Sequence, residues 1–305
     1  MNWSPYIKGF ETYLLLERSL SENSIEAYKY DVDKLYQYFI QTKQEKTPEQ
    51  VKLADLESFI IYINKIGIGE FTQARIISGV KAFYKFLLME DMIDVDPSEL
   101  LEGPKLRRKI PDVLSYEEIR LIFDSMDVSD EKKGGHRNRG ILETLYACGI
   151  RVSELVNLKL SNYFPDEGFL RVIGKGDKER IVPIGSSAIN QIHQYVDHTR
   201  KTLNIAHGHE DYVFLNRRGK KLSRVMVFLV IKKAVEQAGI DKVVSPHTFR
   251  HSFATHLVEG GADLRVVQDM LGHESITTTE IYTHLDRRYL RDTLLRFHPS
   301  YRKEE

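Results

Sequence analysis

One stretch of this chain cannot form a regular helix or strand, and it lies a third of the way along. It reads DPSELLEGPKLRRKIPDVLS over residues 96–115, with three prolines around a glycine and a basic cluster. Proline removes a backbone donor and disfavours helix at the residue before it. This pattern indicates a linker at residues 104–112, between an N-terminal domain, residues 1–103, and a C-terminal domain, residues 113–305. A length of 305 residues suits two domains.

The N-terminal domain carries four helical patterns. Apolar residues recur at helical spacing within residues 4–18, 21–41, 54–67 and 72–90. Ser21 is a suitable N-cap for the second pattern, whose apolar stripe is Ile25, Tyr28, Val32, Leu35 and Phe39. The fourth pattern begins at Thr72, and its inward residues are Ile76, Val80, Phe83 and Leu87. A four-helix domain is therefore predicted.

The C-terminal domain mixes helices with a small amount of strand. Ser115 and Gly149 fit the start of one helix and the end of another. The clearest strand signal is GFLRVIGKGDKERIVPIG, residues 168–185, in which two β-rich runs surround a turn. The run DYVFLN, residues 211–216, predicts a further short strand, and helices follow from about residue 223. The predicted fold is mainly α, with a small β-sheet in a mixed α+β C-terminal domain.

Charge is balanced overall but uneven along the chain. The sequence has 44 basic and 44 acidic residues, which counts against a simple polyanion binder. Basic residues nevertheless gather in residues 104–109, 174–180 and 216–224, and acidic residues in 90–102. Each basic run is either a solvated loop or part of a nucleic-acid contact.

Several other classes of protein are disfavoured. Cys148 is the only cysteine, so no internal disulfide forms and a reducing compartment is expected. No apolar run approaches the roughly 18 to 20 residues that span a bilayer, and the chain does not begin like a secretory signal. We expect a cytoplasmic protein with no membrane contact.

The signatures of nucleotide, zinc and serine chemistry are missing. The sequence has no Gly-x4-Gly-Lys-Ser/Thr loop, no His-Glu-x-x-His pair and no Gly-x-Ser-x-Gly elbow. The run HGHED, residues 207–211, holds potential ligands but is typical of a polar loop. We expect no metal and no cofactor.

The run SPHTFRHSFATHLVEGG, residues 245–261, predicts a helix whose first turn binds an anion. Ser245 is a suitable N-cap, and the proline after it suits the first helical position. His247 and Arg250 then share one face beside the free N–H groups of the helix start. This favours an oxyanion, above all a phosphate. His251 lies four residues after His247, but no acidic third ligand is near, and a structural role is favoured over a metal site.

A second arginine, Arg151, follows the helix-ending Gly149 in ACGIRVSELVNL. Ser153 could cap a new helix directly after it. An arginine fixed at such a junction can meet an anion with both edges of its guanidinium group. The plainer alternative is a surface ion pair with Glu154 or another neighbour.

A polar stretch near the end of the sequence holds an isolated tyrosine. It reads LGHESITTTEIYTH, residues 271–284, with Tyr282 between His273 and His284. Most such tyrosines pack against the protein and turn the hydroxyl to water. A reactive role would require help, because an ordinary tyrosine has a pKa of about 10.

Taken in sequence order, these strings resemble the motifs of the tyrosine recombinases, especially those of the bacterial Xer type. The matching strings are GIRVSEL, GKGDKER, HTFRH, LGH and TTTEIYTH. The positions that match the family's catalytic residues are Arg151, Lys175, His247, Arg250, His273 and Tyr282. The family's usual GLR reads GIR here, which leaves the arginine in place. The resemblance spans nearly the whole chain, because the N-terminal helices resemble the family's core-binding, SAM-like DNA-binding domain.

The resemblance implies that the chain cuts and rejoins DNA by phosphoryl transfer. Tyr282 would attack phosphorus and form a covalent 3′-phosphotyrosyl link, which conserves the energy of the phosphodiester. Arg151 and Arg250 would bind the phosphate oxygens, where such donors are each worth roughly 3 to 4 kcal/mol. Lys175 would act as the general acid, and His247 would exchange a proton with Tyr282. His273 would donate a hydrogen bond to a non-bridging oxygen.

Basic side chains of both domains are expected to bind the DNA backbone from opposite sides, as the halves of a C-shaped clamp. They are Arg75, Lys81, Lys85, Arg217, Arg218, Lys220, Lys221 and Arg224. Binding should weaken steeply with salt. For the three in the first domain, a solvated rim is the alternative.

The resemblance also implies partners. The expected substrate is double-stranded DNA at a specific recombination site, bound by a homo- or hetero-tetramer. A predicted helix after Tyr282 docks either on its own domain or on a neighbouring protomer. In the Xer type a paired Xer recombinase and a septal DNA translocase would support resolution of chromosome dimers. The alternatives are an integrase of a mobile element, a type IB topoisomerase-like activity and a non-catalytic DNA-binding protein.

Overall fold

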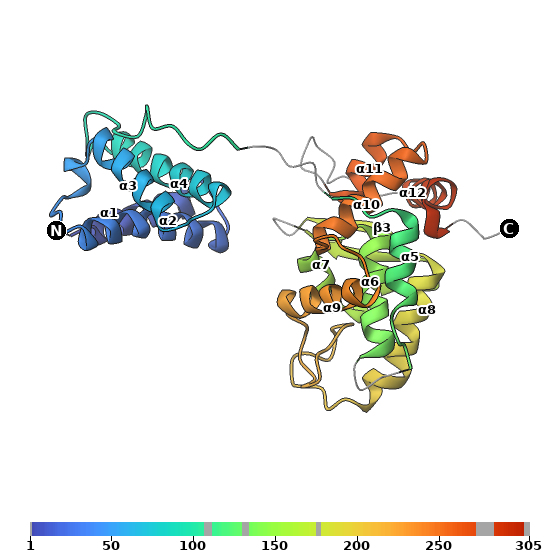
Figure 1. The fold of residues 1–305 in the computed structure, drawn as a ribbon. Helices are drawn as coiled ribbons and strands as arrows, with labels where there is room; N and C mark the ends of the chain where they lie inside the picture. The colour runs from blue at the N-terminus through green and yellow to red at the C-terminus, as the bar shows by residue number, and fades with distance from the viewer. Residues whose placement is uncertain (1, 107–111, 130–133, 175–177, 273–283, 302–305) are drawn as a thin grey trace. The chain divides into compact units, whose positions relative to one another are not determined.

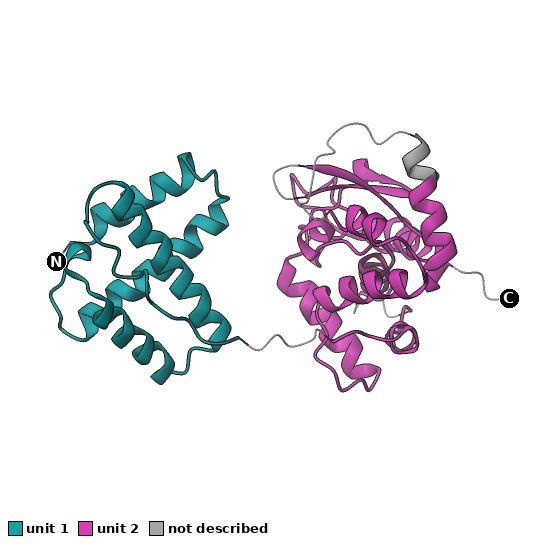
Figure 2. Ribbon diagram, turned by 90° about the horizontal axis from the view of Figure 1, so that it is seen from above, with its two compact units in different colours: residues 1–109 teal, residues 110–305 magenta. Residues whose placement is uncertain are grey.

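The structure is a computed structural model that describes residues 2–106, 112–129, 134–174, 178–272 and 284–301. The chain forms two compact units, residues 1–109 and 110–305 (Figure 2). Each unit has its own hydrophobic core. The linker predicted at residues 104–112 lies partly outside the described residues, and its bounds stay a prediction.

The described residues of the first unit form the four predicted helices. Their bounds are Ser4–Leu16 (α1), Glu22–Gln41 (α2), Leu53–Lys65 (α3) and Glu70–Met89 (α4) (Figure 1). Ser21 caps α2, because its hydroxyl oxygen accepts the Ser24 backbone N–H at 3.4 Å. Helix α4 begins before the predicted Thr72, because Gly69 takes the extended N-cap conformation and Glu70 suits the positive end of the helix dipole.

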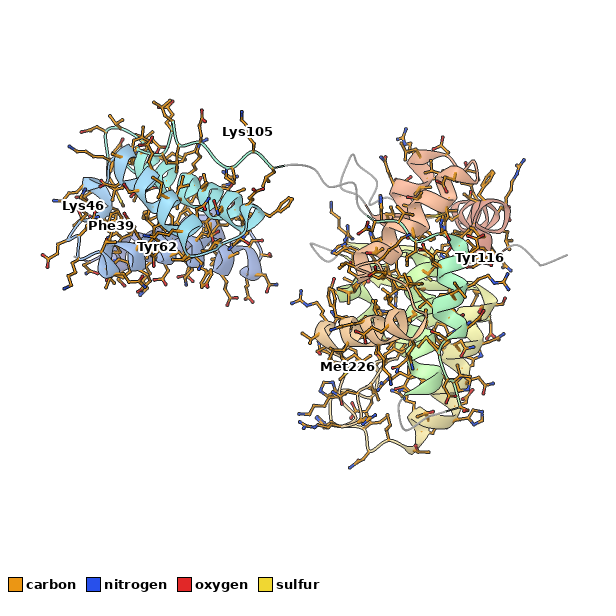
Figure 3. All side chains as sticks on the ribbon, in the orientation of Figure 1. Phe39, Lys46, Tyr62, Lys105, Tyr116 and Met226 are labelled. Atoms are coloured by element: carbon orange, nitrogen blue, oxygen red, sulfur yellow. The ribbon has the colours of Figure 1, made fainter. Side chains whose placement is uncertain are left out.

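Aromatic side chains fill the core of the first unit. The inward residues predicted on α4 are fully buried: Ile76, Val80, Phe83 and Leu87. Trp3 stacks on Phe83 with 6.0 Å between ring centroids and donates its indole N–H to the Lys46 carbonyl at 2.9 Å. Figure 3 labels Phe39, on α2, in this interior. The helical stripes read from the sequence are therefore the faces that meet in the core.

Most of the second unit is helical. Its described α-helices are Tyr116–Asp124 (α5), Gly135–Cys148 (α6), Val152–Val156 (α7), Ser186–Gln194 (α8), Arg224–Gln237 (α9), Pro246–Glu259 (α10), Leu264–Leu271 (α11) and His284–Phe297 (α12). The buried helix α6 contacts α5, α8, α9 and α10 (Figure 1). Ser115 caps α5 and Gly149 ends α6, as predicted. Across the described residues, none of the helices combines the length and the apolar character needed to cross a membrane.

The sheet of the second unit is small and antiparallel. It orders Tyr163–Phe164 (β1), Phe169–Ile173 (β2) and Glu179–Pro183 (β3) as β1-β2-β3. The predicted hairpin is confirmed as β2 and β3. The strand predicted at residues 211–216 is wrong, because only isolated bridges flank a buried apolar run there. That run resembles a strand in sequence because it enters the core, yet no strand pairs along it. The mainly α fold with a small sheet is confirmed.

The C-terminal helix α12 packs on its own unit, which is the plainer of the two expected arrangements. Leu290 and Leu294 are buried in the core of that unit. Just after the helix, His298 is fully buried, with its ring centroid 4.8 Å from that of Tyr146 and 5.1 Å from that of Phe253. Burial lowers the pKa of His298 to about 3, so a neutral ring sits in this aromatic cluster.

Candidate active site

Arg151 lies at the start of α7, directly after the turn that ends α6. The turn requires glycine, because Gly149 has a φ of +57° and a Cβ there would lie 2.3 Å from Cδ1 of Phe253. Arg151 itself is the N-cap of α7, so the cap predicted at Ser153 is wrong. The reason is Glu154, whose carboxylate accepts the Arg151 backbone N–H at 2.7 Å and closes the first turn.

The Arg151 guanidinium group is held by two acceptors and stays partly exposed. Nη1 donates to Oε1 of Glu154 at 3.0 Å, and Nη2 donates to the Gly272 carbonyl at 3.1 Å. The ion pair with Glu154 is therefore present, but it is not a surface pair. The Glu154 side chain is 2% exposed and the Arg151 side chain 34%. A held guanidinium group with an exposed edge is suited to bind an oxyanion.

Arg250 is the fifth residue of α10, just after the first turn, and Ser245 is the N-cap of this helix, as predicted. Its guanidinium group is buried. Nη1 donates to the Gly149 carbonyl at 2.6 Å and Nη2 donates to the Leu271 carbonyl at 2.5 Å. Burial and the charge of nearby Arg151 lower the pKa of Arg250 to about 10. The group is still charged at neutral pH.

A third arginine, Arg180 on β3, joins the two predicted ones. Its Nη1 and Nη2 atoms donate to the two carboxylate oxygens of Glu154 at 2.7 and 2.9 Å. Its Nε donates to the Met270 carbonyl at 3.0 Å, and the residue is 6% exposed. Two parallel charge-assisted bonds of this kind are strong and fix the geometry of both groups.

The three arginines meet at the C-terminal end of α11. Arg180, Arg250 and Arg151 donate, in that order, to the carbonyl oxygens of the consecutive residues Met270, Leu271 and Gly272. A helix end leaves such carbonyl groups without helical partners, and they carry partial negative charge. We call this arrangement, with Glu154, the arginine junction.

Positive charge exceeds negative charge at the arginine junction. Among the described residues that make these contacts, three guanidinium groups surround one carboxylate. Burial alone would raise the pKa of Glu154, but the hydrogen bonds and charges of Arg180 and Arg151 hold that pKa below its ordinary value. The carboxylate is therefore ionised at neutral pH and two positive charges remain unbalanced. Such a site is arranged to bind an anion such as a phosphate.

A groove of about 460 Å³ opens beside Arg151. It runs past α7 and β2, and its lining includes Arg151, Asn157, Lys159, Arg171 and Gly174. Three of these side chains are basic. The groove therefore extends the positive surface away from the arginine junction.

The structure describes three of the six predicted catalytic positions. It places Arg151 and Arg250 together at the arginine junction, and it places His247 exposed at the second residue of α10. The predictions that lie outside the described residues are Lys175, His273 and Tyr282.

The third histidine of α10, His256, has a packing role. It is 8% exposed, and its Nδ1 lies 2.8 Å from the hydroxyl oxygen of Tyr146. Across the ranges that the structure describes, His, Cys, Asp and Glu side chains form no group of three or more that could hold a metal ion.

Sequence reasoning missed two members of the arginine junction. Glu154 was considered only as a surface partner of Arg151, although its position three residues after an N-cap is typical of a capping box. Arg180 was considered only as part of the basic run 174–180. The alternation along β3, which puts Arg180 and Val182 on the same buried face, could have found it.

The basic loop before α9 is an exposed and well-defined turn. The predicted DNA-binding residues of this loop and of the first position of α9 are all exposed: Arg217, Arg218, Lys220, Lys221 and Arg224. Oδ1 of Asn216 accepts the backbone N–H groups of Arg218 and Lys220 at 2.8 and 3.2 Å, and Gly219 has a φ of +67°. Figure 3 labels Met226, just inside the helix that follows. The turn presents its cations from a fixed backbone.

The predicted DNA-binding residues of the first unit do not form a single stripe on α4. Lys81 and Lys85 are neighbours four residues apart, whereas Arg75 lies on another face. Nη1 of Arg75 donates to Oδ2 of buried Asp31 at 2.7 Å, although the Arg75 side chain is 44% exposed. Nζ of Lys81 donates to the Glu99 carbonyl at 3.3 Å. Their contact with DNA stays a prediction.

The chain belongs to the phage integrase family. The model of that family matches residues 112–288, and the model of the phage integrase N-terminal SAM-like domain matches residues 7–91. The two matches thus fall on the second and the first unit, respectively.

Curated relatives refine the class to the tyrosine recombinases of the Xer type. The chain is 43% identical over 298 residues to a tyrosine recombinase XerD of Chlorobaculum tepidum, covering 97% of both chains. It is 38% identical over 293 residues to one of Listeria monocytogenes, covering 96% of this chain and 98% of that relative. The protein is accordingly a site-specific recombinase that breaks and rejoins DNA strands with a tyrosine nucleophile.

Solved structures of recombinases share this fold. The crystal structure of XerA recombinase is 31% identical with a TM-score of 0.50, and 99% of each chain is covered. XerH bound to its difH substrate before cleavage is 22% identical with a TM-score of 0.66, over 83% of this chain and 74% of that one. A λ integrase tetramer bound to a Holliday junction is 16% identical with a TM-score of 0.67, over 92% and 79%.

Proposed function

We propose that this recombinase cuts DNA through the hydroxyl oxygen of Tyr282, with Arg151 and Arg250 bound to the scissile phosphate. The observation that supports this proposal is the arginine junction, where unbalanced positive charge lies at the end of α11. In the sequence, His273 directly follows Gly272, the C-cap of α11, and Tyr282 follows nine residues after His273.

The reaction exchanges one phosphate ester for another. The phenolic oxygen of Tyr282 attacks phosphorus, the bond from phosphorus to the 5′-oxygen breaks, and the protein is left esterified to the 3′-phosphate. Lys175 gives a proton to the departing 5′-oxygen, and His247 takes the proton of the phenol. His273 donates to a non-bridging oxygen. Attack by a 5′-hydroxyl group reverses these steps and rejoins the strand without an external energy source.

Arg151 and Arg250 stabilise the charge that grows on the phosphate oxygens. Both guanidinium groups are already held by protein carbonyl groups, so little reorganisation is needed when the phosphate binds. Arg151 offers a partly exposed edge to the phosphate, and the buried Arg250 guanidinium group is fixed beside it on the adjacent carbonyl. Loss of one such preorganised donor costs roughly 100- to 1,000-fold in rate.

The test of this proposal is a suicide DNA substrate whose nicked strand traps the covalent complex. Wild-type protein should accumulate a protein–DNA adduct, and Tyr282→Phe should form none while its dissociation constant for DNA stays within about threefold. Adduct formation by Tyr282→Phe at the wild-type rate would refute the assignment. Relaxation of plasmids that lack a specific site would instead favour a topoisomerase-like activity.

Double-stranded DNA at a specific recombination site is the proposed substrate. Each unit presents exposed basic side chains, which supports binding by both, and a C-shaped clamp around the duplex remains our proposal. XerH has been solved bound to its difH substrate, and λ integrase has been solved as a tetramer bound to a Holliday junction. By analogy with these proteins, we propose that four protomers assemble on two sites of this chain's substrate.

Resolution of chromosome dimers in the cytoplasm is the proposed biological role. The high identity to XerD relatives supports this role over integration of a mobile element. The partners would be a paired Xer recombinase and a septal DNA translocase. Mapping the sites that the protein occupies on genomic DNA tests the role, because a single chromosomal site is expected, and occupancy confined to the ends of a mobile element would contradict it.

A further inference from the structure

We propose that Arg180 is a positioning residue for DNA strand cleavage, which acts by holding Glu154 and the end of α11 so that Arg151 stays free to bind phosphate. The inference rests on the proposed function. It assigns a role in the reaction to a side chain that binds no substrate itself.

Arg180 makes its polar contacts inside the protein. Its Nη1, Nη2 and Nε atoms donate to the two Glu154 oxygens and to the Met270 carbonyl, at 2.7, 2.9 and 3.0 Å. Only 6% of the residue is exposed. Because Nε, Nη1 and Nη2 of Arg180 all already donate to protein acceptors, we infer that any effect it has on cleavage passes through its neighbours.

These neighbours come from separate parts of the fold. Glu154 belongs to α7 and Met270 to α11, while Arg180 lies on β3, which contacts α11. A Cβ on Gly174 would lie 3.7 Å from Nη1 of Arg180, and one on Gly272 would lie 3.2 Å from it. The end of β2, the start of α7 and the end of α11 therefore all meet at this one side chain.

Glu154 shows why the contact matters for Arg151. Its carboxylate is 2% exposed and carries a full charge, which is costly unless the charge is paired. The Arg180 guanidinium group donates to both oxygens, whereas that of Arg151 reaches only Oε1, and Oε2 otherwise accepts the Arg151 backbone N–H. If Arg180 were removed, the buried carboxylate would draw Arg151 into a closer pair and away from the Gly272 carbonyl and the phosphate.

The test compares Arg180→Met with Arg200→Met in the full-length protein. Arg200 is also a buried arginine of the second unit, but its guanidinium group bonds only to the carbonyls of Tyr212 and Glu210 in the described structure. Both variants should lose stability. Arg180→Met alone should slow single-turnover trapping of the suicide substrate, by about 10- to 100-fold, with DNA affinity within about threefold of wild type.

Two further variants separate positioning from general destabilisation. Arg180→Lys keeps the charge but loses the planar bidentate pair, so it should recover part of the rate. Arg180→Met combined with Glu154→Gln removes both buried charges. The fold-loss in cleavage rate of this double variant should be smaller than the product of the fold-losses of the two single variants. Simple damage to the fold would instead make the losses multiply.

The outcomes are distinct. Wild-type cleavage by Arg180→Met, an equal slowing of Arg200→Met, multiplying losses in the double variant, or a loss confined to DNA binding would each overturn the positioning role. If wild-type protein formed no adduct at all, the proposed function would fail first and the inference with it. An adduct in wild type, lost in Tyr282→Phe and slowed in Arg180→Met, supports both.

Discussion

Arg250 and Arg151 donate to the carbonyl oxygens of two adjacent residues, Leu271 and Gly272, although they lie 99 residues apart in the sequence. The helix end that accepts these bonds directly precedes the segment that carries the proposed nucleophile. One backbone turn thus spaces the two guanidinium groups and fixes where that segment begins. Changes at this turn should affect cleavage more than DNA binding.

Arg250→Lys should slow cleavage strongly. Lysine keeps the charge, but it cannot donate from one planar group to both Gly149 and Leu271. We expect the rate of covalent complex formation to fall by roughly 100-fold or more, with DNA affinity nearly unchanged. The control is Arg137→Lys, whose arginine donates to the Leu215 carbonyl instead of joining the junction. Wild-type cleavage by Arg250→Lys would contradict the role given to this side chain.

Gly272→Ala should impair both folding and cleavage. Gly272 has a φ of +66°, where alanine costs about 1 kcal/mol or more. An added Cβ would also lie 3.1 Å from Cδ of Arg180. The matched control is Gly239→Ala, which has a φ of +68° and no heavy atom within 4 Å of the new Cβ in the described structure. We expect similar backbone strain in both variants and slower adduct formation in Gly272→Ala alone. Equal cleavage by the two would show that the Arg180 contact is unimportant.

Asp31 should make the stability of the first unit fall as pH rises. Burial raises the pKa of this carboxyl group from 3.8 to about 6, against the opposing charge of Arg75. The protonated form is thus favoured in the folded state, and its stabilisation is complete below about pH 4 and lost as pH rises through 6. The difference corresponds to up to about 3 kcal/mol.

The measurement is urea unfolding of wild type and Asp31→Asn at pH 5 and pH 8. Trp3 is the only tryptophan and is buried in the first unit, so its fluorescence reports that unit alone. The free energy of unfolding of wild type, relative to Asp31→Asn, should be greater at pH 5. A difference that stayed constant or grew at pH 8 would mean that the buried carboxylate is fully compensated by Arg75.

The turn before α9 should contribute phosphate contacts. Arg218→Gln with Lys220→Gln should weaken DNA binding and lower the slope of log affinity against log salt by about 1.8, since each lost phosphate contact removes about 0.9. The control is Lys201→Gln, an exposed cation that pairs with Asp197. An unchanged slope in the double variant would remove this turn from the DNA interface.

Local patterns predicted most of the helical framework. Ser21, Ser115 and Ser245 were found as N-caps because a hydroxyl group before an apolar stripe satisfies the free N–H groups of a first turn. Gly149 was found because few other residues end a helix with a positive φ. Such signals lie within a few residues of the feature that they predict.

Features that depend on tertiary contact were harder to predict. The run at 211–216 looked like a strand because it is buried and apolar, but no strand pairs along it. Glu154 and Arg180 looked like surface charges, because nothing local indicates that they are buried together, 26 residues apart. The resemblance to a family predicted that Arg151 and Arg250 act together. The carbonyl groups at the end of α11 that hold them are seen only in the fold.

Peptide mapping of the trapped adduct by mass spectrometry tests the central claim most directly. After digestion with protease and nuclease, the account predicts a single nucleotide joined through its 3′-phosphate to the phenolic oxygen of Tyr282. A nucleotide joined to another residue, or linked through a 5′-phosphate, would contradict it.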